Sequence, residues 1–141
     1  MVEASLLLPN PPSPYVIFIC THLLINNERL RSIVDWRDGR SLSVGSRGGE
    51  QQVGQLAAYC AAKAGVVTLT KAIADETKGT NITANTALPS VIAPPTNRSA
   101  RGSENAHQWV KPEPLAQVIC FLGSEAAKDV RGAAMAVYGS I

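Results

Sequence analysis

Tyr59 and Lys63 are the residues whose types and spacing most clearly suggest chemistry, because they stand four positions apart in a segment rich in helix-forming residues. Side chains at that spacing share one face of a helix and can reach the same small site. A lysine ammonium beside a phenol favours the phenolate form, which eases proton transfer near neutral pH. Ser46 lies upstream at the end of a predicted short strand, where its hydroxyl can hydrogen-bond a carbonyl oxygen in the same pocket. The three residues predict proton transfer at a carbonyl or alcohol oxygen; the alternative is an exposed pair on a solvated helix face.

The segment that must position this pair is the clearest helix in the sequence. Residues 57–78 contain strong helix formers and few breakers, with Val66, Leu69 and Ile73 at helical spacing on one face. Gly79 follows, where the C-terminal end of a helix favours glycine. The segment also contains small residues past which another backbone can approach closely, namely Ala57, Ala58, Ala61, Ala62, Ala64 and Gly65.

The neighbouring segments predict strands and a second helix. Residues 41–46 and 81–87 have strand character, and the second of these is closed by Leu88 and Pro89. A helix is predicted to start at Pro112, with an apolar face formed by Leu115, Val118, Ile119 and Leu122. Residues 132–138 form a third apolar run of strand length. Strand, helix, strand, helix and strand in this order predict an α/β fold with a parallel sheet.

The remaining segments are predicted to connect or precede these elements. Residues 1–14 are rich in proline and predict an irregular arm, whereas residues 15–30 are compatible with either a helix or a strand. Residues 35–39 have the composition of a turn. Two loops are expected, a glycine-rich one at residues 47–54 and a long polar one at residues 90–110.

Length and composition exclude several classes of protein. The chain has 141 residues, which suits one compact domain, and its net charge of +2 is too small for a nucleic-acid footprint. The 3 cysteines and 2 histidines form no cluster with the spacing of a zinc site or a disulfide framework. The longest apolar run, residues 15–25, is shorter than the roughly 20 residues needed to span a membrane. We therefore expect a cytoplasmic protein with no nucleic-acid, metal or membrane partner.

The sequence around these residues resembles the short-chain dehydrogenase/reductase family, most closely its 3-oxoacyl-carrier-protein-reductase-like members. The segments that carry the resemblance are Ser46, QLAAYCAAKAGV at 55–66, NITAN at 81–85 and LPSVI at 88–92. The resemblance covers about residues 40–141 and implies the C-terminal half of a doubly wound, Rossmann-like parallel sheet. We accordingly interpret residues 15–141 as a truncated domain of this family, a C-terminal-half fragment behind the arm at residues 1–14.

The resemblance also implies roles for individual residues. Tyr59 matches the general acid/base, Lys63 the lysine that assists it and hydrogen-bonds the nicotinamide ribose, and Ser46 the serine that orients the substrate oxygen. Pro89 and Ile92 match the segment that packs beside the nicotinamide and contacts its carboxamide. The implied cofactor is NAD or NADP, and the implied reaction is hydride transfer between the nicotinamide and a small carbonyl or alcohol substrate.

The sequence departs from the family pattern at the cofactor. It contains no glycine-rich TGxxxGxG-type loop, which supplies the pyrophosphate site at a helix N-terminus. Ser90 replaces the glycine of the family's Pro-Gly, and Pro94 replaces a threonine and offers neither a hydroxyl nor a backbone N–H. We therefore expect little or no activity from the chain alone. The alternative is a non-catalytic module that forms homo-oligomers or pairs with a full-length relative. The substrate and the choice between NAD and NADP stay open.

Overall fold

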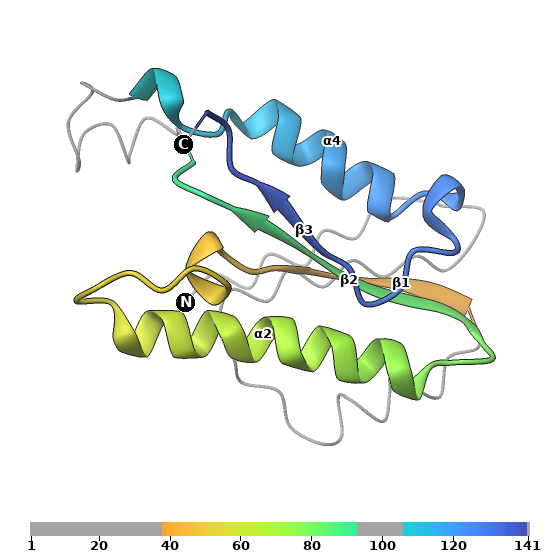
Figure 1. Cartoon of the computed structure of the whole chain (residues 1–141). Coiled ribbons are helices and arrows are strands. Elements are labelled where there is room, and N and C mark those ends of the chain that lie inside the picture. Colours follow the sequence, from red (N-terminus) through yellow and green to blue (C-terminus); the bar gives the residue numbers. More distant parts are fainter. Residues whose placement is uncertain (1–37, 93–105, 141) are drawn as a thin grey trace, which may run out of the picture.

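The chain folds as an alternation of strands and helices in the residues that its structure, a computed structural model, describes, which are 38–92 and 106–140 (Figure 1). The elements are β1 (Asp38–Val44), α2 (Ala57–Glu76), β2 (Asn81–Pro89), α4 (Pro112–Leu122) and β3 (Ala134–Val137). Short 3-10 turns lie in the connections, namely η1 (Arg47–Gly49), η2 (Ala106–Gln108) and η3 (Glu125–Ala127). This order confirms the predicted α/β class. The predictions for residues 1–14 and 15–30, and most of the predicted turn at 35–39, lie outside the described residues.

The three described strands form one parallel sheet in the order β1-β2-β3. In its register, Asp38 pairs with Asn81 and Val44 with Ala87, while Pro89 pairs with Val137. After its first residue, β2 is buried along its whole length. Burial on both faces explains why β2 lacks the alternation of polar and apolar residues that marks a strand with one wet face.

Two layers of helix enclose the sheet, with α2 on one face and α4 on the other (Figure 1). Successive residues of a strand point to opposite faces, so β2 contributes to both layers of core. Ala84 packs with Ile73 and Leu69 of α2. Ala87 packs with Leu115 of α4, in a cluster completed by Val110, Ile92, Val118, Ile119 and Val137. The predicted apolar faces of both helices therefore face the sheet.

The structure corrects the predicted bounds of all three strands. β3 is shorter than the predicted residues 132–138 and spans Ala134–Val137. β1 begins at Asp38 rather than at residue 41, because Asp38 and Gly39 continue the ladder with β2 where a turn was expected. β2 runs through Pro89 instead of ending before Leu88. Pro89 itself has no N–H to donate, and the ladder is continued by the next residue. Here the N–H of Ser90 donates to the Val137 carbonyl at 3.2 Å.

The end of α2 is set by a threonine and a glycine. The Thr77 hydroxyl donates to the Ile73 carbonyl at 2.8 Å, and Thr77 is the C-cap, so the helix ends at Glu76 rather than at residue 78. Gly79, predicted to follow the helix directly, lies three residues beyond Glu76, and its φ of +81° is in the left-handed region that favours glycine.

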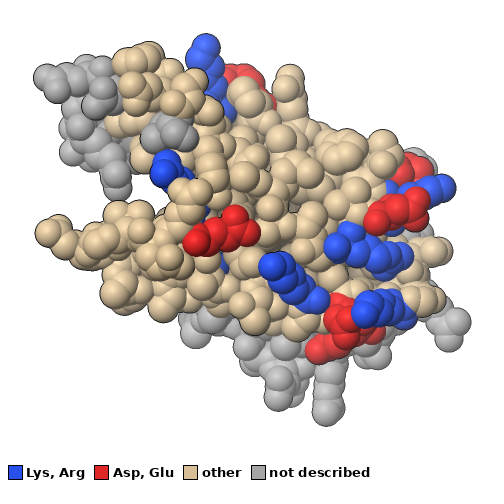
Figure 2. Space-filling model, viewed as in Figure 1, with Lys and Arg blue, Asp and Glu red and all other residues tan. Residues whose placement is uncertain are grey.

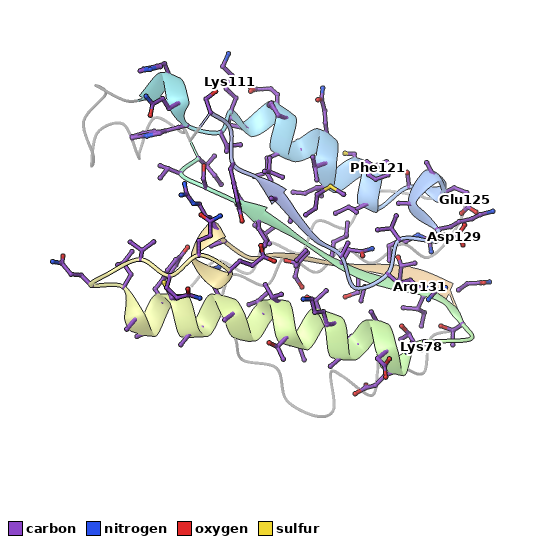
Figure 3. The ribbon with its side chains drawn as sticks, in the orientation of Figure 1. Lys78, Lys111, Phe121, Glu125, Asp129 and Arg131 are labelled. Atoms are coloured by element: carbon purple, nitrogen blue, oxygen red, sulfur yellow. The ribbon has the colours of Figure 1, made fainter. Side chains whose placement is uncertain are left out.

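Charged side chains gather toward one end of the face seen in Figure 2, the end where Figure 1 has the α2–β2 turn and η3. Figure 3 labels four of them there, Lys78, Glu125, Asp129 and Arg131. None of the helices in residues 38–92 and 106–140 is both long and apolar enough to cross a membrane. Those residues also hold no group of three or more His, Cys, Asp or Glu side chains placed to bind a metal.

Candidate active site

The candidate residues lie where the parallel strands end. β1 leads into the turn that begins with Ser46, and β2 leads into the segment from Pro89 to Ile92. The η1 turn lies beside the N-terminal part of α2, which carries Tyr59 (Figure 1). Open parallel sheets bind their ligands outside the carboxyl ends of their strands, so this edge is the expected place for a site.

Ser46 lies two residues beyond β1, not at the end of the strand as predicted, and it is the N-cap of η1. Its backbone is extended, and its Oγ accepts a hydrogen bond from the N–H of Gly48 at 3.2 Å. Its carbonyl accepts a second bond from the N–H of Gly49 at 2.9 Å. Because Oγ is the acceptor in the first bond, the hydroxyl hydrogen can be donated to another oxygen.

Tyr59 and Lys63 share one face of α2, as their spacing predicts. The Lys63 Nζ lies 5.8 Å from the centroid of the Tyr59 ring, within the range of a cation–π contact. Tyr59 lies in the first turn of α2 and is 46% exposed. The phenol is therefore accessible to a substrate.

Two glycines bring the Ser46 turn against this helix. A Cβ added at Gly48 would lie 3.3 Å from Cε1 of Tyr59, and one added at Gly49 would lie 2.8 Å from the carbonyl oxygen of Lys63. The second position is also 3.2 Å from the backbone nitrogen of Ala64, one of the small residues predicted to admit a close backbone. The structure therefore brings Ser46, Tyr59 and Lys63 into one region.

Pro89 and Ile92 lie at the same edge of the sheet but belong to the opposite layer of core. Pro89 is buried and pairs with Val137. Ile92 is half-buried, forms a parallel bridge with Val110 and packs in the cluster under α4. Their predicted contact with a nicotinamide stays a prediction.

A contact that sequence reasoning missed joins the Ser46 turn to the residue after β3. The Tyr138 hydroxyl donates to Oε2 of Glu50 at 3.4 Å, and the Arg47 guanidinium carbon lies 5.5 Å from the Tyr138 ring centroid. Burial raises the pKa of Tyr138, as do the charge and the hydrogen bond of Glu50, while Arg47 opposes the shift. No local pattern predicts this contact, because Glu50 and Tyr138 are 88 positions apart.

Comparison with known sequences finds relatives over most of the chain. A family model described as enoyl-(acyl carrier protein) reductase matches residues 28–139. The chain is 34% identical over 119 residues to 3-oxoacyl-(acyl-carrier-protein) reductase MabA of Mycobacterium tuberculosis, an alignment covering 79% of this chain and 48% of that protein. It is 36% identical over 119 residues to D-beta-hydroxybutyrate dehydrogenase of Cupriavidus necator, covering 70% of this chain and 45% of the relative. The chain thus spans about half the length of the curated relatives it matches.

Comparison with solved structures finds the same fold. Actinorhodin polyketide ketoreductase, in a crystal structure with NADPH, matches with a TM-score of 0.66 and 30% identity over 72% of this chain and 46% of that one. Acetoin dehydrogenase YohF from Salmonella typhimurium matches with a TM-score of 0.67 and 28% identity over 79% of this chain and 46% of that one. The sheet and its helices therefore correspond to part of a larger fold in these proteins.

Proposed function

The chain belongs to the short-chain dehydrogenase/reductase family, and we propose that Ser46, Tyr59 and Lys63 form the proton-transfer side of a nicotinamide-dependent oxidoreductase site. The observation that carries this proposal is the close approach of the Ser46 turn to the Tyr59 ring through Gly48. The 5.8 Å between the Lys63 Nζ and the Tyr59 ring centroid supports the proposal further, as does the position of the Ser46 turn just after the carboxyl end of β1.

In the proposed reaction the side chains of this chain handle the proton and the substrate oxygen. Ser46 donates its hydroxyl hydrogen to the oxygen of a small carbonyl compound and so orients it. Tyr59 gives its phenolic proton to that oxygen during reduction and takes it back during oxidation. Lys63 stabilises the phenolate left on Tyr59. A nicotinamide bound here supplies or accepts the hydride.

The residues at this edge fit one end of a dinucleotide better than the other. The Lys63 ammonium and the Tyr59 hydroxyl suit the ribose next to the nicotinamide, with Pro89 and Ile92 as further candidates for the ring. The 141 residues contain no TGxxxGxG-type turn to hold the pyrophosphate. We therefore propose that these residues alone bind NAD(H) or NADP(H) weakly and turn over slowly.

The test begins with binding. NADH and NADPH are titrated calorimetrically into the folded chain, with folding checked by circular dichroism, and we expect weak heats at millimolar cofactor. An absence of heat from both cofactors would overturn cofactor binding by these residues.

The second step measures NADH and NADPH oxidation with a panel of 3-oxoacyl thioesters, acetoacetate and diacetyl, chosen from the chemistry in the relatives' names. Tyr59→Phe removes the proton donor and should reduce any turnover by at least about a hundredfold. Phe121→Leu is the control, because Phe121 lies on α4 and is exposed. Turnover that survives Tyr59→Phe would show that Tyr59 is not the acid/base.

A second candidate function is self-association through α2, or pairing with a longer relative. The helix presents an exposed row of small residues, Ala57, Ala58, Ala61 and Ala62, next to Leu56, which is 43% exposed. Flat small-residue faces allow two helices to pack closely. Ala61→Glu should then shift the chain toward monomer in sedimentation, whereas Lys71→Glu, farther along α2, should not. A wild-type chain that is monomeric and does not bind a full-length relative would rule this function out.

A further inference from the structure

The turn that follows β3 connects several segments at the carboxyl edge of the sheet. The Ser90 hydroxyl donates to the carbonyl of Tyr138 at 2.7 Å, which ties the turn to the end of β2. The N–H of Ser140 donates to the Gln108 carbonyl at 3.3 Å, which ties it to η2. Gly139, at a φ of +70°, would place a Cβ only 2.9 Å from that same carbonyl oxygen. These contacts fix the backbone on both sides of the Tyr138 side chain.

From this fixed backbone, the Tyr138 side chain reaches the turn that carries Ser46. Its hydroxyl donates to Glu50 at 3.4 Å, and its ring lies under Arg47 at 5.5 Å. Arg47 is held in addition by Gln51, whose Oε1 accepts from the Arg47 Nε at 2.6 Å. Arg47 and Glu50 stand on either side of the two glycines that face α2. The turn is therefore held between the Tyr59 helix on one side and Tyr138 on the other.

We propose that Tyr138 is a positioning residue that keeps the Ser46 turn seated against α2, where Gly48 faces the Tyr59 ring, and thereby fixes the position of Ser46 relative to Tyr59. The part that concerns Ser46 as a substrate-orienting group rests on the proposed function. The holding of the turn does not depend on it.

The proposed role of Tyr138 is to keep the backbone hydrogen bonds of the Ser46 turn formed. The N–H groups of Glu50 and Gln51 both donate to the Arg47 carbonyl, at 3.0 and 2.8 Å, and Ser46 accepts from Gly48 and Gly49. The turn is short and belongs to no long helix or strand, so its closed form, in which these four bonds are made, also depends on the contacts of its side chains. A cation–π contact and a hydrogen bond at a partly exposed site each favour the closed form by about two- to fivefold.

The experiment is amide hydrogen exchange by NMR on the full chain, followed at Gly49, Glu50 and Gln51. Tyr138→Phe removes the bond to Glu50 but keeps the ring under Arg47, and should speed exchange at these amides about two- to fivefold. Tyr138→Leu removes both contacts and should speed it about five- to twenty-fivefold.

Two controls separate a local effect from general destabilisation. The Thr77 amide, which donates to the Ile73 carbonyl at 3.0 Å at the other end of α2, should keep its exchange rate in both variants. Phe121→Leu, on the far layer, should leave the turn unchanged. Unchanged turn amides in Tyr138→Leu, or an equal acceleration at Thr77, would overturn the proposal. If Tyr138→Leu does not fold, the same comparison in Tyr138→Phe decides the question.

The activity measurement separates this inference from the proposed function. Where the wild-type chain turns over, Tyr138→Leu should lower kcat for the carbonyl substrate about five- to twenty-fivefold, while the KM for the nicotinamide cofactor stays the same. The kcat of Tyr138→Phe should lie between those of the wild type and Tyr138→Leu. A change in the cofactor KM alone would contradict the positioning role. Where the wild-type chain does not turn over, the proposed function fails and the exchange experiment still tests whether Tyr138 holds the turn.

Discussion

At the scale of single residues, Gly49 decides how closely the turn after β1 approaches α2. An added Cβ would lie 2.8 Å from the carbonyl oxygen of Lys63 and 2.9 Å from its carbonyl carbon, and both are backbone atoms of a helix. A helix backbone cannot move aside as a flexible side chain does. Only glycine therefore allows the Ser46 turn to sit where the structure has it.

The first prediction compares two glycines of this loop. Gly49→Ala should lower the free energy of unfolding by about 1–3 kcal/mol, because the turn must move away from Lys63. Gly54→Ala is the matched control: no atom lies within 4 Å of its added Cβ, and we expect a neutral effect or a stabilisation of up to about 1 kcal/mol. Urea unfolding of the wild type and the two variants measures both changes in the free energy of unfolding. Equal stability of the two variants would contradict the close approach.

At the scale of elements, α4 ends on a fully buried residue next to an exposed one. Leu122 is 0% exposed and Phe121 is 42% exposed, although they are neighbours in the chain. Figure 3 labels Phe121 on α4. The 3.6-residue period of the helix turns the first side chain toward the sheet and the second toward its outer side.

The second prediction follows from that difference. Leu122→Ala should cost about 2–5 kcal/mol of unfolding free energy, because it opens a cavity under α4. Phe121→Ala should cost about 1 kcal/mol or less, since much of the ring is already in water. Thermal and urea unfolding of both variants provide the measurement. A larger loss from Phe121→Ala than from Leu122→Ala would show that α4 is rotated relative to the structure.

At the scale of the whole molecule, one end of the sheet carries the candidate site and the opposite end carries many charges (Figures 2 and 3). The charged side chains at that end make different kinds of interaction. Lys78 and Asp75 form an ion pair on the surface of the α2 end, and both are more than two-thirds exposed. Arg131 instead donates to two backbone carbonyls, those of Ile82 and Thr80.

The third prediction compares these two cations. Lys78→Gln should change the free energy of unfolding by no more than about 0.5 kcal/mol, as expected for an exposed ion pair in water. Arg131→Gln should cost about 1–3 kcal/mol, because it removes charged hydrogen bonds that tie the segment before β3 to the start of β2. Measuring the free energy of unfolding of both variants at low and at high salt distinguishes the two effects. A strongly salt-sensitive loss in Lys78→Gln would contradict this division.

Much of the fold follows from local patterns in the sequence. The helical spacing of Val66, Leu69 and Ile73 predicts the face of α2 that contacts the sheet, and Pro112 marks the first residue of α4. The bounds of β1 did not follow, because Asp38 and Gly39 are unfavourable strand residues that join the sheet only through their pairing with β2.

The candidate site divides in the same way. The spacing of Tyr59 and Lys63 predicts that they share a helix face, and they do. The approach of the Ser46 turn to α2 depends on two glycines packed against that helix, and the contact of Tyr138 with Glu50 depends on the return of β3 to the sheet. Contacts between residues far apart in the chain depend on tertiary structure, which no local pattern encodes.

The three described strands lie in the sheet in the same order as in the chain, which has a consequence for how the protein is made. β1, α2 and β2 can pair as soon as they have left the ribosome, before β3 has been synthesised. In that interval the edge of β2 that later receives β3 is open to any other strand. We therefore expect the nascent chain to be most prone to misassembly, and to gain most from a chaperone, during synthesis of the segment between β2 and β3.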